Sequence, residues 1–588
     1  MNIIFETLNK YYGYDTFKDG QLEIINNILN RKDTFAILPT GGGKSLCYQI
    51  PAIIFSGVTI VISPLISLMK DQVDNLVANG IRAEYINSTQ KLDEIDAVIY
   101  RCMRNETKIL YIAPEKLENE FFKKQLRKLN ISQIAIDEAH CVSMWGHDFR
   151  KSYALIRPFI ESLRIRPVIT AFTATATEVV KNDAIKLLGL INPLIYVGTF
   201  DRDNLNINVY IEEDKLEFVK DTIRENEYEG GIIYCSTRKE VDNLYYYLKD
   251  LGYSVGKYHG GLSDKEKAYY QDEFLNENIT TMIATNAFGM GIDKSNVRYI
   301  IHFTLPKNIE SYYQEIGRAG RDGESAKCHL LFNRSDIRTL EYLIYTTVQT
   351  NRKEIEIKKL QSIIDLAESK ECYREYILNY FGEKNVRSFC ANCSNCLNSD
   401  EVRDYTIEAQ KILSCVDRSR ERYGIAVLVD VLRGMSGPKI ANDGLNKLTT
   451  YGIMREYSSR FIRDLIKMLI EYNYVSLKDG TYSMLKLNEN SYKVLKSNMK
   501  VLLKMEGSVE EQVLNQELFN SLRLWRKQKA NIEGIKPYII FSDATMIEMC
   551  NLMPKNEEEL LQVRGMGEKK FEKYGKEILE FFNKSSNK

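Results

Sequence analysis

The sequence has no excess of either charge, because its 80 Lys plus Arg balance 80 Asp plus Glu over 588 residues. That balance argues against a protein coated in positive charge, such as a histone-like packing protein. Nucleic acid stays open as a ligand, since binding depends on where charge sits and a total averages that away. The sequence also lacks any uninterrupted apolar run near the roughly 18 residues of a membrane-spanning helix, so we expect none.

A targeting segment and a disulfide framework are lacking as well. Met1–Lys10 contains Glu6 and has no basic start followed by an apolar run, so we expect no signal peptide. The 11 cysteines are odd in number and mostly scattered, and in a long chain of this kind we expect them to be reduced. Apolar residues make up 44% and charged residues 27%, which excludes a chain disordered throughout, a fibre and a small disulfide scaffold.

Over its first 340 or so residues the sequence alternates short β-branched apolar runs with helical stretches. This alternation predicts parallel sheets covered by helices, and its interruption near Gly198–Asn208 predicts two such α/β domains. A charged helical stretch with clustered cysteines follows, then a small helical domain ending in a hairpin, then a helical end. We therefore predict units at 1–205, 206–340, 341–404, 405–500 and 510–588.

A glycine-rich motif, Leu38–Ser45, lies between an apolar strand and a helix. Three glycines let backbone N–H groups turn inward around phosphates, Lys44 can reach the β- and γ-phosphates, and the Ser45 hydroxyl can ligate Mg²⁺. Leu38 stands where the strict motif has Gly, and taken alone the motif could be a turn with a chance Lys. We assign ATP binding to Thr40, Gly41, Gly42, Gly43, Lys44 and Ser45.

Two further motifs favour nucleotide hydrolysis. The apolar run Ile134–Ile136 ends in Asp137, predicted to hold Mg²⁺ through water, and Glu138, predicted to orient or deprotonate the attacking water. We expect His140 to link this site to the neighbouring domain. A solvated acidic turn is common in isolation, but the phosphate motif about 95 residues earlier favours the catalytic interpretation.

The stretch Gln314–Asp322 contains Arg318 and Arg321, three residues apart. We expect them to share one face at a helix start and to neutralise charge on a transferring phosphoryl group across a domain cleft. Gln314 completes the predicted catalytic set. A surface helix with ion pairs is the alternative.

Four cysteines, Cys372, Cys390, Cys393 and Cys396, follow the spacing C-x17-C-x2-C-x2-C. Four thiolates suit tetrahedral Zn²⁺, and an iron–sulfur cluster is the chemical rival. No open catalytic position is needed, because hydrolysis is assigned elsewhere, so we expect a structural metal.

The order of these motifs, with Thr173–Thr177 (TATAT) between the acidic and arginine motifs, resembles superfamily 2 helicases. Asp137–Arg150 (DEAHCVSMWGHDFR), Phe17–Gln21 and Ala284–Asp293 narrow the resemblance to the RecQ DNA helicases, over nearly the entire chain. The resemblance implies a multidomain α/β protein: two RecA-like parallel-sheet domains, a helical zinc-binding module, a winged helix and a small all-α HRDC domain.

The resemblance also implies roles for single residues. Gln21 would read the adenine edge, with Phe17 and either Tyr11 or Tyr14 as stacking surfaces. Lys18 departs from the usual Arg, which would weaken nucleotide contacts there.

Residues Cys141–Arg150 look like the aromatic-rich loop of the family, which couples DNA contact to hydrolysis. Trp145 and Phe149 offer faces for base stacking, worth about 1–3 kcal/mol per base, although Phe149 could instead be core. His147 and Arg150 add polar and cationic contacts. The family often has Gln where Met144 stands. We expect this difference to alter the coupling of DNA contact to hydrolysis, although Trp145 should dominate that coupling.

The C-terminal units should hold DNA. The 405–500 segment carries 16 Lys plus Arg against 10 Asp plus Glu and resembles the winged helix. Tyr482, near its hairpin tip, would be the wedge that splits a duplex, or else an ordinary surface Tyr. In the HRDC-like segment, four basic residues share one helix and are predicted either to bind DNA or to form a solvated face: Arg523, Arg526, Lys527 and Lys529.

The expected function is an ATP- and Mg²⁺-dependent DNA helicase with structural Zn²⁺. The family implies 3′→5′ movement on single-stranded DNA and the unwinding of duplex, forked or branched DNA in recombination and repair. A single-stranded-DNA-binding protein is a further candidate partner, no membrane is involved, and the location would be cytoplasmic, at the nucleoid in a bacterium. Two rivals remain open: an RNA unwinder or RNA-stimulated ATPase, and a DNA-binding scaffold without activity.

Overall fold

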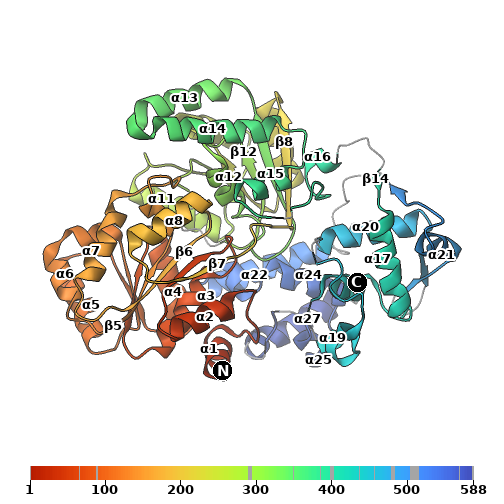
Figure 1. Ribbon diagram of the computed structural model, residues 1–588, viewed down its shortest axis with the longest axis horizontal. Coiled ribbons are helices and arrows are strands. Elements are labelled where there is room, and N and C mark those ends of the chain that lie inside the picture. The colour runs from red at the N-terminus through yellow and green to blue at the C-terminus, as the bar shows by residue number, and fades with distance from the viewer. Residues whose placement is uncertain are drawn as a thin grey trace.

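The computed structural model gives five successive units, laid out in Figure 1 from the N-terminal α/β domain to the C-terminal helices. The structure describes residues 2–64, 66–87, 90–288, 294–348, 350–384, 386–397, 403–435, 438–455, 457, 459–478, 484–503, 516–563, 565–567 and 570–585. Within these residues, no helix combines the length and the apolarity needed to cross a bilayer.

The first domain is built on a seven-stranded sheet of order β3-β4-β2-β5-β6-β1-β7, in which every described pair is parallel. Its strands are β1 Thr34–Ile37, β2 Val58–Ile62, β3 Ala83–Ile86, β4 Ile109–Ile112, β5 Ile131–Ile136, β6 Val168–Thr173 and β7 Leu194–Val197. Its helices are α1 Asn2–Tyr12, α2 Gln21–Leu29, α3 Lys44–Ile54, α4 Ile66–Ala78, α5 Leu92–Met103, α6 Glu120–Leu126, α7 Ile156–Glu161 and α8 Glu178–Leu188, with short 3-10 turns η1 Pro114–Glu118, η2 Ala139–Val142 and η3 Lys151–Leu155. The central strands are buried on both faces, which explains their unbroken apolar runs.

The second domain repeats this design with a six-stranded parallel sheet of order β10-β11-β9-β12-β13-β8. Its strands are β8 Leu205–Ile211, β9 Gly230–Tyr234, β10 Val255–Tyr258, β11 Thr281–Ala284, β12 Val297–His302 and β13 Ala326–Phe332. Its helices are α9 Lys215–Glu225, α10 Arg238–Asp250, α11 Asp264–Leu275, α12 Ile309–Ile316 and α13 Ser335–Thr347. The predicted pair of parallel-sheet domains is confirmed. The chain passes between the two sheets through Gly198–Asn204, the segment where the alternating pattern lapses.

The cysteine-bearing module packs on the second domain rather than standing apart. It comprises η4 Thr350–Arg352, α14 Lys353–Glu368, α15 Tyr373–Tyr380, α16 Ser394–Leu397 and β14 Arg403–Asp404. α14 lies along α13 at the top of Figure 1. α16 lies against β8, and Cys393, the residue before α16, forms a parallel bridge with Ile207 of β8.

The next unit has its own apolar core and stands to the right in Figure 1. It comprises α17 Thr406–Arg418, α18 Ile425–Arg433, α19 Pro438–Asn442, η5 Leu445–Lys447, α20 Ser459–Glu471, β15 Ser476–Lys478, β16 Met484–Lys486, α21 Glu489–Leu495 and β17 Leu502–Leu503. β15 and β16 form the predicted antiparallel hairpin, and β17 pairs with β14. Tyr482, the predicted wedge, lies outside the described residues.

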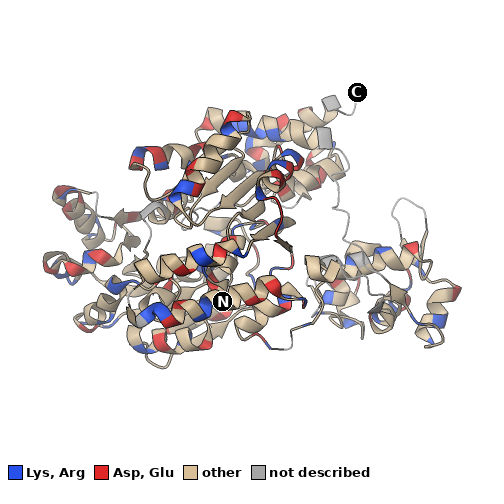
Figure 2. Cartoon of the chain, turned by 90° about the horizontal axis from the view of Figure 1, so that it is seen from above, with Lys and Arg blue, Asp and Glu red and all other residues tan. Residues whose placement is uncertain are grey.

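The last unit is helical around a fourth core: α22 Gln516–Glu533, α23 Pro537–Ile540, α24 Asp543–Leu552, α25 Glu557–Leu561, a π-helical turn at Phe571–Gly575, and α27 Lys576–Ser585. α22 begins this unit and faces the second domain. In Figure 2 basic and acidic residues are interspersed along the helices, in keeping with the balanced total charge.

Candidate nucleotide and DNA site

The glycine-rich loop joins β1 to α3 and has the backbone that its glycines permit. Gly41 and Gly43 have φ of +81° and +77°, the left-handed region that favours glycine. A Cβ on Gly43 would lie only 2.3 Å from Gln21 Nε2. The loop ends at the N-terminus of α3, where unpaired N–H groups and the helix dipole favour an anion. Lys44 begins that helix, and its Nζ donates to the Leu38 carbonyl at 3.4 Å.

The predicted adenine contacts lie directly on this loop. Gln21 Nε2 donates to the carbonyls of Gly42 at 3.2 Å and Gly43 at 3.3 Å, and Gln21 Oε1 accepts from the Lys18 N–H. Lys18 Nζ donates to the Gly41 carbonyl at 2.9 Å, so the residue that departs from the family pattern braces the loop. Phe17 packs edge-on against Phe5 in a small apolar cluster. Tyr11 is partly buried against a different apolar cluster, the one that contains Tyr48, and Tyr14 is exposed.

Asp137 and Glu138 follow β5, one strand removed from β1 in the sheet, so parallel topology brings both motifs to one edge. Burial and the neighbouring Glu138 raise the pKa of Asp137 to about 7, against the opposing charge of Lys44. Burial lowers the pKa of Lys44, and the two carboxylates oppose that shift. A hydroxyl at Ser45 and these carboxylates form the hard oxygen donor set that Mg²⁺ prefers, so the residues fit the ion.

His140 connects the acidic motif to the aromatic-rich loop. Its Nδ1 lies 2.8 Å from Thr173 Oγ1 and 3.3 Å from Glu138 Oε2, and its ring stacks on His147 with centroids 4.2 Å apart. Burial lowers the pKa of His140 to about 3 and that of His147 to about 4, so both rings are neutral near pH 7. We expected a link to the second domain; these contacts instead stay within the first.

Arg318 and Arg321 lie in turns after α12, which ends at Ile316, and not at a helix start as expected. Gly320, with φ of +55°, ends the helical path. The turn nevertheless faces the phosphate loop: a Cβ on Gly41 would lie 3.7 Å from Arg321 Cγ, and one on Gly317 would lie 3.2 Å from Thr40. Arg318 is 5% exposed, and burial lowers the pKa of its guanidinium. Gln314 lies partly buried on α12.

The aromatic-rich loop presents Trp145, which is 48% exposed. Phe149 is partly buried, and the Arg352 Cζ lies 5.6 Å from the centre of its ring. The Phe149 ring is therefore neither a fully exposed stacking surface nor a core residue. Arg150 pairs with Asp148 at 2.9 Å and donates to the Pro64 carbonyl.

This loop is fastened by two basic residues that the sequence did not point to. Arg352 donates to the Gly146 carbonyl at 3.0 Å, and Lys359 donates to the Trp145 carbonyl at 2.8 Å while pairing with Glu310. Both come from the start of the cysteine-bearing module, about 200 residues downstream. A cavity of about 300 Å³ lies between the loop, α13 and α14.

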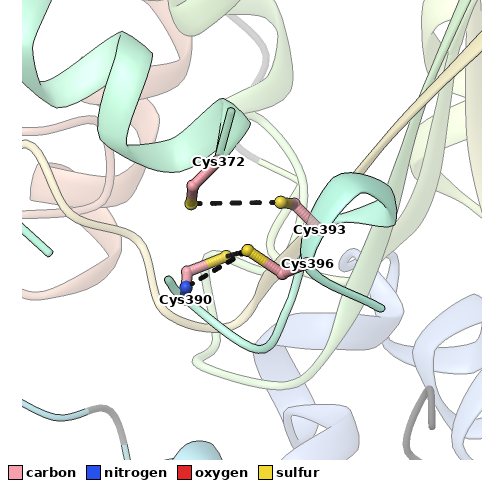
Figure 3. A group of neighbouring side chains, drawn as sticks. All are labelled: Cys372, Cys390, Cys393 and Cys396. Atoms are coloured by element: carbon pink, nitrogen blue, oxygen red, sulfur yellow. Dashed lines mark hydrogen bonds between the residues drawn. The ribbon is translucent and has the colours of Figure 1, made fainter. Parts of the chain in front are cut away.

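The four clustered cysteines meet at one point, as Figure 3 shows. Their Sγ atoms all lie within 4.8 Å of one another, with Cys372–Cys393 and Cys390–Cys396 each at 4.0 Å. Zn–S bonds of about 2.3 Å in a tetrahedron place sulfurs about 3.8 Å apart, so the thiolates fit a single Zn²⁺. A cluster of several irons and sulfides would hold its thiolates farther apart, which disfavours the iron–sulfur alternative. None of the 11 cysteines is joined to another by a disulfide.

Of the four basic residues predicted either to bind DNA or to form a solvated face, three contact other parts of the protein, and Lys529 makes an exposed pair with Glu577. On α22, Arg526 is fully buried and donates to Asp543 at 2.8 Å and to Glu277 of the second domain at 3.1 Å. Lys527 donates to the Glu277 carbonyl, and Arg523 lies 3.5 Å from Glu229. Apart from Asp543, the acidic partners Glu277 and Glu229 lie more than 240 positions away, which no local pattern indicates.

Family models match five consecutive segments of the chain. They are described as DEAD/DEAH box helicase for 18–182, helicase conserved C-terminal domain for 214–323, RecQ zinc-binding for 334–397, RQC domain for 399–512 and HRDC domain for 515–581.

Curated relatives match along the whole length. "ATP-dependent DNA helicase RecQ" of Bacillus subtilis (strain 168) is 43% identical over 575 residues, which is 97% of each chain. The protein of the same name from Pasteurella multocida (strain Pm70) is 39% identical, over 98% of this chain and 93% of its own length. A "Putative ATP-dependent RNA helicase R290" of Acanthamoeba polyphaga mimivirus is 36% identical over 81% of this chain.

Proposed function

The chain belongs to the RecQ family of ATP-dependent DNA helicases, and on that premise we propose how its residues divide the work. ATP binds at the edge where the two parallel-sheet domains meet, and hydrolysis there drives movement along one DNA strand. The observation that carries this proposal is the approach of the arginine turn to the phosphate loop, with Arg321 Cγ 3.7 Å from a Cβ built on Gly41.

Thr40–Ser45 would wrap the phosphates, with Lys44 between the β- and γ-phosphates. Gln21 would turn its amide from the loop carbonyls to the adenine edge, with Phe17 beside it. Arg318 and Arg321 would face the γ-phosphate from the second domain, and Gln314 would support them from α12. The buried Arg318 and the partly buried Arg321, in a turn that touches the loop, support charge neutralisation there.

Ser45 and Asp137 would hold Mg²⁺, which supplies positive charge to the phosphates as they separate. Glu138 would accept a proton from the attacking water, with His140 fixing the carboxylate through its Nδ1. Cys372, Cys390, Cys393 and Cys396 would hold Zn²⁺ in a structural role. The proposed boundaries of the five units are 1–205, 206–340, 341–404, 405–500 and 510–588, although α13 (Ser335–Thr347) crosses the second of them.

DNA would reach this chemistry through the aromatic-rich loop. Trp145 offers its exposed indole to a base, with Phe149, His147 and Arg150 around it. The stack of His147 on His140 gives the loop a direct contact with the acidic motif. A movement of Trp145 would therefore shift His140 and, through it, the Glu138 carboxylate. Tyr482 remains the proposed wedge of the winged-helix hairpin.

We propose movement in the 3′→5′ sense on single-stranded DNA, with forked or branched duplexes as substrates in recombination and repair. A single-stranded-DNA-binding protein is a proposed partner. The proposed location is cytoplasmic, at the nucleoid in a bacterial host.

The test is strand displacement on duplexes with 3′ or 5′ single-stranded tails, with and without ATP. We expect displacement of the 3′-tailed duplex only, and only with ATP. Lys44→Ala should abolish it, because the side chain proposed to reach the β- and γ-phosphates is lost, while zinc content stays normal. A Lys44→Ala variant that unwinds forked DNA at the wild-type rate would overturn the mechanism.

RNA unwinding is the second candidate, favoured by the name of the mimivirus relative, an RNA helicase. Comparing the ATPase rate with single-stranded DNA and with RNA of equal length separates the two. Stronger stimulation by RNA would transfer the proposal to that substrate. The inactive scaffold would show no nucleotide hydrolysis with either.

A further inference from the structure

The segment that connects the two α/β domains carries Arg202, whose guanidinium uses all five of its N–H donors. Nη1 donates to the carbonyls of Thr40 at 2.8 Å and Gly317 at 3.3 Å. Nη2 donates to the carbonyls of Ala319 and Gly320, both at 2.9 Å, and Nε donates to Asn204 Oδ1 at 3.3 Å. One of these acceptors belongs to the phosphate loop, and three belong to the turn that carries Arg318 and Arg321.

These hydrogen bonds satisfy backbone carbonyls of the turn after α12. The carbonyls of a buried turn need hydrogen-bond donors from elsewhere, because irregular backbone supplies few of its own. After α12 they meet a planar cation, and Asn204 adds bonds from its Nδ2 to the carbonyls of Gly320 at 2.8 Å and Glu324 at 2.7 Å. A lysine could not replace the arginine, since three donors on one atom cannot serve four carbonyls on both sides of a cleft.

Arg202 is itself fixed by the zinc-binding module. Arg374, two residues beyond the thiolate of Cys372, donates from Nη1 to the Arg202 carbonyl at 2.7 Å and pairs with Asp201. Its Nη2 donates to the Leu205 carbonyl at 2.5 Å. From between two other cysteines of the cluster, Asn392 donates to the carbonyls of Asp203 and Leu205. The path of the connecting segment is therefore set on both sides of Arg202.

We propose that Arg202 is a positioning residue for ATP hydrolysis: it holds the turn bearing Arg318 and Arg321 against the phosphate loop. This inference rests on the proposed nucleotide site. Arg202 acts through backbone carbonyls and takes no part in the chemistry. The proposed nucleotide-binding contacts, those of Gln21 and the phosphate loop, all lie in the first domain. Loss of Arg202 should therefore lower kcat while leaving nucleotide affinity nearly unchanged.

The experiment uses the full chain and the variants Arg202→Lys, Arg202→Gln and Asn204→Ala. The measurements are kcat and KM for ATP with saturating single-stranded DNA, and the Kd of a fluorescent ADP. For Arg202→Lys we expect kcat to fall at least about tenfold, within the 10³–10⁵-fold attributed to an arginine finger, while KM and Kd stay within about twofold. Asn204→Ala, which loses the bonds to Gly320 and Glu324, should show a smaller fall in kcat.

Arg101→Lys is the matched control, because Arg101 also makes several bonds, to Glu84, but at the far edge of the first domain. It should keep wild-type kcat. Wild-type kcat in Arg202→Lys would overturn the inference, and so would a parallel loss of kcat, ADP affinity and melting temperature. If Arg202→Lys does not fold, an unchanged kcat in Asn204→Ala overturns it. Failure of the proposed function is recognised separately, as a wild-type chain without ATPase activity or an active Lys44→Ala variant.

Discussion

The contact between the HRDC unit and the second α/β domain depends on a balanced buried charge network, and Glu277 is its centre. Eight residues form it, four acidic and four basic: Glu229, Glu277, Asp322, Asp543, Lys294, Arg298, Arg523 and Arg526. Glu277 pairs with two buried basic residues, Lys294 at 3.4 Å and Arg526 at 3.1 Å. The perturbation is Glu277→Gln, which keeps the shape and removes the charge.

Although burial alone would raise it, Lys294 and Arg526 lower the pKa of the Glu277 carboxyl to about 2. The charged carboxylate is thus favoured in the docked state. Removing one member of a buried pair typically costs about 3–5 kcal/mol, because the partner charge stays buried and uncompensated. At 1.4 kcal/mol per tenfold, this weakens docking by about 100-fold to several thousand-fold. The contribution is present above the unfolded pKa near 4.3 and is lost as pH falls toward 2.

Double electron–electron resonance between two spin labels measures docking directly. Tyr269 on α11 and Ile532 on α22 are 59% and 81% exposed and can be replaced by cysteine for labelling, since most native thiols are buried. We expect one narrow distance distribution in the parent chain and a second, broad population in Glu277→Gln. Lys529→Gln, which breaks an exposed pair within the HRDC unit, should leave the distribution unchanged. An unchanged distribution in Glu277→Gln would refute the reasoning.

Two further predictions concern the metal centre and the histidine stack. Cys390→Ser should give poorly folded protein with less zinc, because three thiolates and a hydroxyl hold Zn²⁺ weakly. Metal analysis and thermal melting measure both effects. A variant with full zinc and an unchanged melting temperature would contradict the prediction. Since burial lowers the pKa values of His140 and His147 to about 3 and 4, the unfolded chain binds more protons below pH 6.5. The free energy of unfolding should therefore fall by about 1.4 kcal/mol per pH unit for each histidine between pH 6.5 and 4. In urea titrations at pH 7 and 5.5, His147→Gln should lose about half of that slope, and an unchanged slope would count against the buried neutral stack.

The fold was predictable because its signals are local. Apolar runs of parallel strands, glycines of a phosphate loop and a Cys-x2-Cys turn each occupy a few adjacent residues, and the topology of a parallel sheet then brings loops such as those after β1 and β5 to one edge. The arginine turn was predicted as a helix start because three-residue spacing is also helical; Gly320 decides against it through its left-handed φ.

What the sequence could not yield are pairings over long separations. Arg526 was interpreted as a surface cation because its partner, Glu277, lies 249 residues away. Arg202 has backbone carbonyls as acceptors, which leave no trace in side-chain patterns. Lys359 reaches the loop of Trp145 across 214 residues, again through a carbonyl.

The zinc-binding module has contacts with both halves of the proposed motor. Its first helix region holds the aromatic-rich loop through Arg352 and Lys359, and its next helix holds the connecting segment through Arg374. Because α14 and α15 pack together in the unit that holds the four cysteines, the loop proposed to meet DNA and the arginine proposed to hold the turn of Arg318 and Arg321 rest on the same support. A displacement of that loop therefore has two physical routes to the cleft: directly, through the stacked histidines, and through α14 and α15 to Arg202.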